Sequence, residues 1–247
     1  MLNEQTHDKL VQMRLRGMAA ALQESIERGG DDSLSFFERL GLLVDREWNE
    51  RQDRSLKRRL QLAKLREPAA CVEDIDYRHP RKLDRTVMER LAACQWIRNH
   101  ESVLFTGPTG LGKTWLACAL GNQACRMGFS VVYYRLPRLF HHLRMARADG
   151  SYAKELARLA RTEVLILDDW GLSVLDDEPR RDLLEILEDR RGIRATVVTS
   201  QLPVSKWHDT LGDPTIADSI LDRLVHQAHR VELAGASMRK RKPGKKA

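Results

Sequence analysis

The sequence predicts an α/β fold, in which a five-stranded parallel sheet lies between helices and follows a small all-helical domain. Two observations carry this prediction. In the C-terminal part, short apolar runs alternate with helical stretches, which is the pattern of a parallel sheet covered on both faces. Residues 1–66, in contrast, show helical periodicity. A chain of 247 residues is long enough for one such domain with a small appendage, and too short for two large domains.

The first 66 residues are expected to form a helical domain that binds DNA or a partner protein. Ser35 and Glu38 have the spacing of a capping box, which predicts that a long helix begins there. The C-terminal half of this helix is rich in basic residues, and a surface that faces DNA or a partner is one interpretation. A solvated helix face is the other. The candidate DNA contacts are Arg51, Arg54, Lys57, Arg58 and Arg59.

Pro68 ends the helical region, and residues 67–83 are expected to be a linker to an α/β domain at residues 84–236. Asp84 can cap a helix that continues to about Arg98. Strands are predicted at residues 102–106, 131–135, 164–168, 196–200 and 230–233. Helices are predicted at residues 113–126, 137–148, 152–160, 178–191 and 215–227.

The positive charge is concentrated at the C-terminus. The net charge is +7, and the tail at residues 237–247 contains six basic residues and no acid, so the rest of the chain is nearly balanced. Such a tail can contact the phosphate backbone of nucleic acid, which makes four of its residues candidate DNA contacts: Arg239, Lys240, Arg241 and Lys242. The alternative is a solvated tail that aids solubility.

The composition indicates a soluble, cytoplasmic protein. No apolar run approaches the ~20 residues that a membrane-spanning helix needs. The N-terminus lacks the basic and then apolar segments that mark a secretory signal. The four cysteines form no Cys-x-x-Cys pair, and we expect them to be free thiols in a reducing compartment.

Residues Gly107 to Thr114 read Gly-Pro-Thr-Gly-Leu-Gly-Lys-Thr and stand between an apolar strand and a helix. In this context the motif predicts a P-loop, because its glycines let backbone N–H groups turn towards phosphates and the helix N-terminus is positive. We expect Lys113 to contact the β- and γ-phosphates of ATP, and the Thr114 hydroxyl to bind Mg²⁺. The expected ATP contacts are Gly107, Pro108, Thr109, Gly110, Leu111, Gly112, Lys113, Thr114 and Trp115.

The apolar run at residues 164–167 ends in two acids, Asp168 and Asp169. A buried strand in this position delivers its carboxylates beside the P-loop. We expect Asp168 to join Thr114 in the Mg²⁺ shell, through water, and Asp169 to polarise the water that attacks ATP. The alternative for Asp169 is a second magnesium-shell acid or a helix cap.

Two further polar residues are candidates for catalysis. Gln201 follows a strand, where its amide can orient water near the γ-phosphate; a simple turn residue is the alternative. Arg223 lies on an apolar helix and can reach the γ-phosphate of a neighbouring subunit. The alternative is a surface arginine paired with Asp222 or Asp218.

Together these residues resemble the IstB-like ATP-binding family, whose members are AAA+ ATPases encoded with transposases of the IstA type in bacterial insertion sequences. The resemblance covers nearly the whole chain. It rests on residues 107–114, 165–171, 199–201 and 220–226, with support from the N-terminal helices. It implies an AAA+ P-loop NTPase core, in which Gln201 senses the γ-phosphate and Arg223 is an arginine finger acting in trans.

The resemblance also implies partners. A homo-oligomer, ring or helical, assembles on duplex DNA with ATP bound, deforms the DNA and delivers it to an IstA-type transposase. Because the sequence shows no base-reading module, we expect the DNA binding to be largely independent of sequence. Hydrolysis then disassembles the complex. Asp169 is one methylene shorter than the glutamate of many AAA+ motors, which predicts slow hydrolysis until DNA or transposase stimulates it.

Two other functions are compatible with a P-loop. A DnaC-like loader of a replicative helicase has the same ATPase core and differs in its partner and in the strand form of its DNA. A small-molecule kinase needs an acceptor-binding lid, and the helix that carries Arg223 and the basic tail argue against it.

Overall fold

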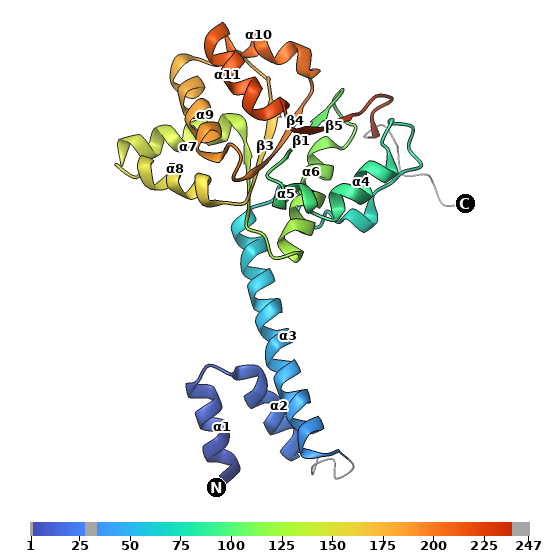
Figure 1. Ribbon diagram of the computed structural model, residues 1–247, viewed down its shortest axis with the longest axis vertical. Helices are drawn as coiled ribbons and strands as arrows, with labels where there is room; N and C mark the ends of the chain where they lie inside the picture. Colours follow the sequence, from blue (N-terminus) through green and yellow to red (C-terminus); the bar gives the residue numbers. More distant parts are fainter. Residues whose placement is uncertain (1, 28–33, 239–247) are drawn as a thin grey trace, which may run out of the picture. The chain divides into compact units, whose positions relative to one another are not determined.

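The computed structural model describes residues 2–27 and 34–238 (Figure 1). The chain divides into two compact units, one up to Arg58 and one from Arg59 onward. The division falls within a helix, α3 (Phe36–Ala63), and not at the expected residue 66. The residues after it explain why. Ala63, Leu65 and Ile75 are buried in the second unit, so the segment that follows α3 packs as part of that unit.

The first unit contains α1 (Leu2–Gln12), α2 (Arg16–Glu27) and most of α3. The capping box at the start of α3 is confirmed: the Ser35 N–H donates to Glu38 Oε2 at 2.7 Å, and the Glu38 N–H donates to Ser35 Oγ at 3.3 Å. The buried Glu47 carboxylate of α3 accepts the Gly17 N–H of α2 at 2.7 Å. This contact at the positive end of α2 stabilises the packing of α2 against α3.

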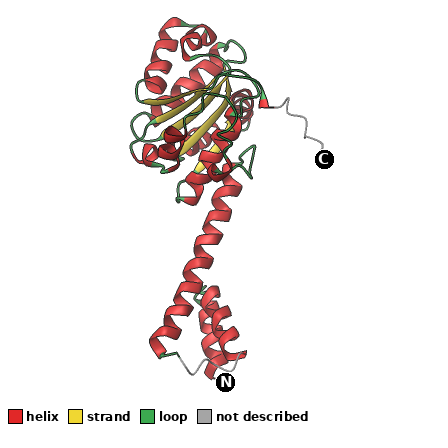
Figure 2. Ribbon diagram, turned by 90° about the vertical axis from the view of Figure 1, so that its right-hand side faces the viewer, coloured by secondary structure: helices red, strands yellow, loops and turns green. Residues whose placement is uncertain are grey.

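The second unit contains the predicted parallel sheet. Its strands are β1 (Ser102–Thr106), β2 (Val131–Arg135), β3 (Val164–Trp170), β4 (Ala195–Ser200) and β5 (Ala228–Glu232). They are all parallel and lie in the order β2-β3-β4-β1-β5, among helices (Figure 2). The main helices are α4 (Arg85–Ala92), α5 (Gln95–Arg98), α6 (Lys113–Arg126), α7 (Leu136–Ala148), α8 (Tyr152–Arg161), α9 (Asp177–Arg190), α10 (Trp207–Leu211) and α11 (Pro214–Val225).

The core lies around the sheet. Every residue of β1 and β4 is buried, as expected for central strands covered on both faces. One apolar cluster joins the sheet to α7, α9 and α11, and includes Leu143, Leu167, Leu183 and Leu224. The free energy gained by burying these side chains holds the helices against the sheet and so fixes the strand ends where the site is built. Among the described residues, no helix is both long and apolar enough to cross a membrane.

Two helical predictions were wrong in detail. The helix expected from Asp84 to about Arg98 is broken at Cys94, which has a left-handed backbone (φ 57°) between α4 and α5. Asp84 does cap α4, accepting the N–H groups of Thr86 and Val87. The short helix α10, which follows β4, was not predicted; its Trp207 packs against Trp170 of β3, with the two rings tilted by 33° and their centroids 5.0 Å apart.

Candidate active site

The carboxyl ends of β1, β3 and β4 meet at one edge of the sheet, because β4 pairs with both other strands. A cavity of about 380 Å³ opens there. We call it the phosphate cavity. Its walls include residues of the P-loop and of α6, namely Thr109, Gly110, Gly112, Lys113, Thr114 and Trp115. The other lining residues are Arg66, Glu67, Asp74, Asp76, Arg81, Asp169, Thr199, Ser200, Gln201 and Met238.

The P-loop has the backbone that its glycines permit. Gly107 (φ 133°) and Gly110 (φ 82°) are in conformations that L-residues rarely adopt. A side chain at Gly107 would also collide with the Leu233 carbonyl, and one at Gly110 with the Ser237 hydroxyl. The Leu233 carbonyl is part of the backbone, so this contact excludes a side chain at Gly107, whereas at Gly110 the positive φ is the main obstacle to other residue types. The loop leads directly into α6, whose N-terminus faces the cavity.

Lys113 and Leu111 hold the loop in shape. The Lys113 ammonium donates to the carbonyls of Gly107 at 2.6 Å and Pro108 at 2.9 Å. The Leu111 side chain is fully buried, and its carbonyl accepts from the buried Arg81 guanidinium at 2.8 Å. The Lys113 ammonium therefore lies inside the loop, at the place where we expect the phosphate oxygens to bind.

Asp168 is fully buried and accepts hydrogen bonds from three hydroxyl groups. Thr114 Oγ1 donates to Asp168 Oδ1 at 2.8 Å, and Thr199 Oγ1 donates to the same oxygen. The Tyr133 hydroxyl donates to Oδ2 at 2.6 Å. Burial raises the pKa of Tyr133 above its ordinary value, so the phenol keeps the proton that it donates. Arg66 Nη1 also lies 3.7 Å from Oδ2.

Thr114 and Asp168 fit the magnesium site that a P-loop implies. Both offer hard oxygen donors, the ligand type that Mg²⁺ prefers, and they lie within hydrogen-bond distance of each other at the cavity. This pair was expected from the sequence. Tyr133, Thr199 and Arg66, which contact the same carboxylate, were not predicted.

Asp169 sits at an irregularity in β3. Leu167 pairs with Val198 and Trp170 with Ser200, so β3 has one residue more than β4 between these pairs. This is the count of a β-bulge, a feature that is common beside active sites. Asp169 has a left-handed backbone (φ 65°), and its carboxylate accepts from Arg135 Nε at 2.7 Å. The bulge lets Asp169 line the phosphate cavity directly after the buried Asp168.

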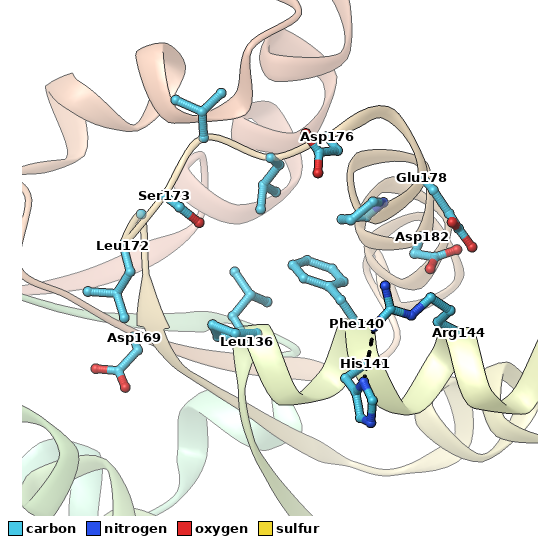
Figure 3. A pocket seen from close by; sticks show the side chains of 15 residues that line it. Leu136, Phe140, His141, Arg144, Asp169, Leu172, Ser173, Asp176, Glu178 and Asp182 are labelled. Atoms are coloured by element: carbon cyan, nitrogen blue, oxygen red, sulfur yellow. Dashed lines mark hydrogen bonds between the residues drawn. The ribbon is translucent and has the colours of Figure 1, made fainter.

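Asp169 also lines a second cavity of about 330 Å³, which lies between α7 and the segment that joins β3 to α9 (Figure 3). Leu136, Phe140 and Arg144 of α7 form one side of it, and the Arg144 guanidinium contacts His141 at 3.2 Å. Leu172 and residues up to Asp176 form the other side. A single acid is therefore common to the walls of both cavities.

The other two catalytic candidates differ in position. Gln201 follows β4, is exposed and lines the phosphate cavity. Arg223 lies on α11, which begins with Pro214 and is capped by Asp213, and it is not among the residues that line the cavity. Its side chain forms an ion pair with Glu188 of α9 and donates to the Ser219 carbonyl at 2.6 Å. Its partner is neither Asp222, which pairs with Arg191, nor Asp218, which pairs with His208.

The candidate DNA contacts of α3 have different surroundings. Arg51 pairs with Glu47 at 2.6 Å, and Arg54 pairs with Glu50, one turn earlier in each case. Lys57 and Arg58 are exposed. Arg59 donates to the Cys125 carbonyl at 2.9 Å within the second unit. The four candidates of the tail, at residues 239–242, lie outside the described residues.

Comparison with known proteins decides the family. The family model described as IstB-like ATP binding protein matches residues 8–246. The chain belongs to the IstB-like ATP-binding family. An insertion sequence ATP-binding protein of Sinorhizobium fredii, y4pL, is 54% identical over 240 residues, which cover 97% of this chain and 98% of the relative.

Solved structures confirm the AAA+ fold of this IstB-like chain. DnaI is 22% identical with a TM-score of 0.58, and the match covers 67% of this chain and 92% of DnaI. DnaA from Aquifex aeolicus, bound to AMPPCP, is 17% identical with a TM-score of 0.57, and the match covers 67% of this chain and 50% of DnaA. At these identities the similarity concerns the fold.

Proposed function

We propose that this protein is an ATPase that oligomerises on duplex DNA, deforms it and delivers it as target to an IstA-type transposase, with ATP hydrolysis driving disassembly. The proposal rests on the observation that the candidate catalytic residues lie at two separate places in the chain. The phosphate cavity contains the P-loop, Asp169 and Gln201, whereas Arg223 lies outside it on α11. A site completed by a neighbouring copy couples hydrolysis to assembly.

Each residue of the cavity has a role in this proposal. Backbone N–H groups of the P-loop and the Lys113 ammonium bind the phosphates, after Lys113 leaves the carbonyls that it contacts in the loop. Asp169 accepts a proton from the attacking water, and Gln201 orients that water. Thr114 and Asp168 would hold Mg²⁺, which neutralises charge on the phosphates when bound.

Arg223 is the group that a second copy supplies. An arginine finger stabilises charge that develops on the γ-phosphate, and the same family of sites uses such fingers in cis or in trans. Arg223 is bound to Glu188 in the single chain, so we propose that assembly exchanges this partner for the phosphate of the adjacent subunit. Free protein then hydrolyses ATP slowly, and the DNA-bound oligomer hydrolyses it faster.

DNA binding in this proposal is directed at the backbone. The exposed Lys57 and Arg58, the paired Arg51 and Arg54, and the basic tail are the candidate contacts. Contacts of this kind give little sequence preference and an affinity that falls steeply with salt. The insertion-sequence name of the Sinorhizobium relative supports transposition as the process that the DNA complex serves.

The experiment that tests this function measures the size of the protein on duplex DNA by light scattering, with ATP and Mg²⁺ and then with ADP. The proposal predicts that a large oligomer forms on duplex DNA with ATP and Mg²⁺ and does not form with ADP. Single-stranded DNA of the same length is the matched control. A protein that stays small on duplex DNA in both nucleotide states, and binds single strands instead, contradicts the proposal and favours a helicase-loader function.

A further inference from the structure

Asp168 is a buried carboxylate whose negative charge must be neutralised before any divalent cation arrives. Its exposed fraction is 0%, and the three hydroxyl groups that donate to it are neutral. Burial of an ionised carboxylate without a cation is costly, because hydroxyl dipoles replace only part of its hydration. The ion pairs of the described chain place a cation at this carboxylate: Arg66 Nη1 lies 3.7 Å from Asp168 Oδ2.

Arg66 reaches this position from a short segment between α3 and Pro68. Lys64, directly after α3, has a left-handed backbone (φ 50°), and Leu65 is buried, with its side chain near Gly121 of α6. These two features fix where Arg66 leaves the backbone. Its side chain is 44% exposed and lines the phosphate cavity, so it has room to move while its anchor stays in place.

We propose that Arg66 is a positioning residue of the phosphate cavity: it is the resident counter-cation of Asp168, and the divalent cation that arrives with ATP must displace it. The inference rests on the proposed function, since it presumes that Thr114 and Asp168 hold Mg²⁺. Arg66 and the cation compete for one carboxylate. Arg66 therefore sets how much Mg²⁺ is needed for nucleotide binding, and its side chain leaves the carboxylate while the buried Leu65 keeps the backbone in place.

If Arg66 and Mg²⁺ compete for Asp168, loss of Arg66 should lower the Mg²⁺ concentration that nucleotide binding needs. A purely structural role of Arg66 does not predict this decrease. Arg66→Gln removes the competing charge, so the concentration of Mg²⁺ that half-saturates binding of a fluorescent ATP analogue falls by up to about fivefold. Arg66→Lys keeps the charge and stays near the wild-type value. Arg126→Gln is the matched control, because Arg126 is similarly exposed (40%) and paired, with Glu73, away from the cavity. Its Mg²⁺ requirement is expected to equal that of the wild type.

Thermal unfolding gives a second readout that does not depend on hydrolysis. Arg66→Gln lowers the unfolding temperature of the nucleotide-free protein, whereas with saturating Mg²⁺ and ATP the variant and the wild type unfold at the same temperature. The increase caused by Mg²⁺ and ATP is thus larger in Arg66→Gln. A structural role would lower both temperatures equally.

The two failures can be told apart. If the wild type needs Mg²⁺ to bind the analogue, but Arg66→Gln shows the wild-type Mg²⁺ requirement and the wild-type increase in unfolding temperature, the inference about Arg66 is wrong and the proposed function stands. If the wild type binds the analogue equally well in EDTA and in Mg²⁺, the magnesium role in the proposed function is wrong, and the inference is wrong with it.

Discussion

The phosphate cavity and the end of α11 differ in whether their functional groups are already assembled within one chain. At the cavity, groups from β2, β3, β4 and α6 already contact one another, since Asp168 accepts from Tyr133, Thr199 and Thr114. At α11, the candidate finger Arg223 is bound to Glu188 of its own chain. The difference supports the proposal that a single chain binds nucleotide by itself, whereas fast hydrolysis requires a second copy.

The largest expected effect comes from Arg223→Ala. Loss of the finger should lower hydrolysis on DNA by ~10³–10⁵-fold, because such an arginine acts on charge that exists only in the transition state. Affinity for ATP should remain unchanged, which a binding measurement with a fluorescent analogue checks. Arg191→Ala is the matched control, because Arg191, directly after α9, forms an exposed ion pair with Asp222 of α11. Equal loss in both variants would contradict the assignment.

Asp169→Asn should affect hydrolysis alone. An amide cannot accept the proton of the attacking water, and loss of a general base costs ~10²–10⁴-fold in rate. ATP and DNA binding should persist, so the variant should remain on DNA as a stable oligomer, visible by light scattering after ATP is added. If this variant dissociates from DNA at the wild-type rate, Asp169 is not the acid that activates water.

Lys113→Ala should weaken ATP binding itself. Removal of one charge-assisted hydrogen bond to phosphate corresponds to a loss of ~10–100-fold in affinity. Lys154→Ala, an exposed lysine of α8 outside the cavity, is the control. Oligomers on DNA should be lost with Lys113→Ala at ATP concentrations that saturate the wild type. Wild-type affinity in this variant would show that the loop binds something other than a triphosphate.

The smallest effect concerns the Arg223 partner. Glu188→Gln weakens the bond that holds Arg223 within its own chain, and an ion pair with a half-exposed acid contributes ~0–1 kcal/mol. Hydrolysis on DNA should therefore rise by up to about fivefold. Asp222→Asn breaks the neighbouring pair with Arg191 and serves as the control, since its carboxylate is similarly exposed. A fall in activity with Glu188→Gln would indicate that Glu188 positions Arg223 for its function.

Much of the fold could be predicted from the sequence, because residues beside each strand or helix mark where it begins and ends. The strands at residues 102–106 and 131–135 and the helix at residues 113–126 were predicted with the observed bounds. Local signals mark them, such as the P-loop glycines and the apolar runs. The break at Cys94 has no such signal beside it. Helix α10 does have one, because Gly212 directly after it has a left-handed backbone (φ 76°), but a helix of five residues is too short to show helical periodicity.

The contacts of the site could be predicted only in part. Asp168 and Thr114 were expected at one site, because a P-loop motif and an acidic strand end occur together, and their side chains do lie within hydrogen-bond distance. Their role as magnesium ligands stays a prediction. Tyr133 and Thr199 reach Asp168 because β2 and β4 flank β3, and periodicity does not specify strand order. The pairing of Arg223 with Glu188 depends in the same way on the packing of α9 against α11. From the sequence alone, the candidate partners of Arg223 were Asp218 and Asp222, which are nearer to it along the chain.

The most direct test of the shared site is a mixing experiment with Arg223→Ala and Lys113→Ala on duplex DNA. The first variant keeps an intact P-loop and the second keeps an intact finger. If the finger acts in trans, a complete site forms at each interface where the intact P-loop of Arg223→Ala faces the intact finger of Lys113→Ala. In an equal random mixture, this arrangement is expected at about a quarter of the interfaces (one half times one half). The account predicts that ATP hydrolysis is partly restored in the mixture. If mixed oligomers form and hydrolysis stays at the level of either variant alone, Arg223 does not complete the site of a neighbouring subunit.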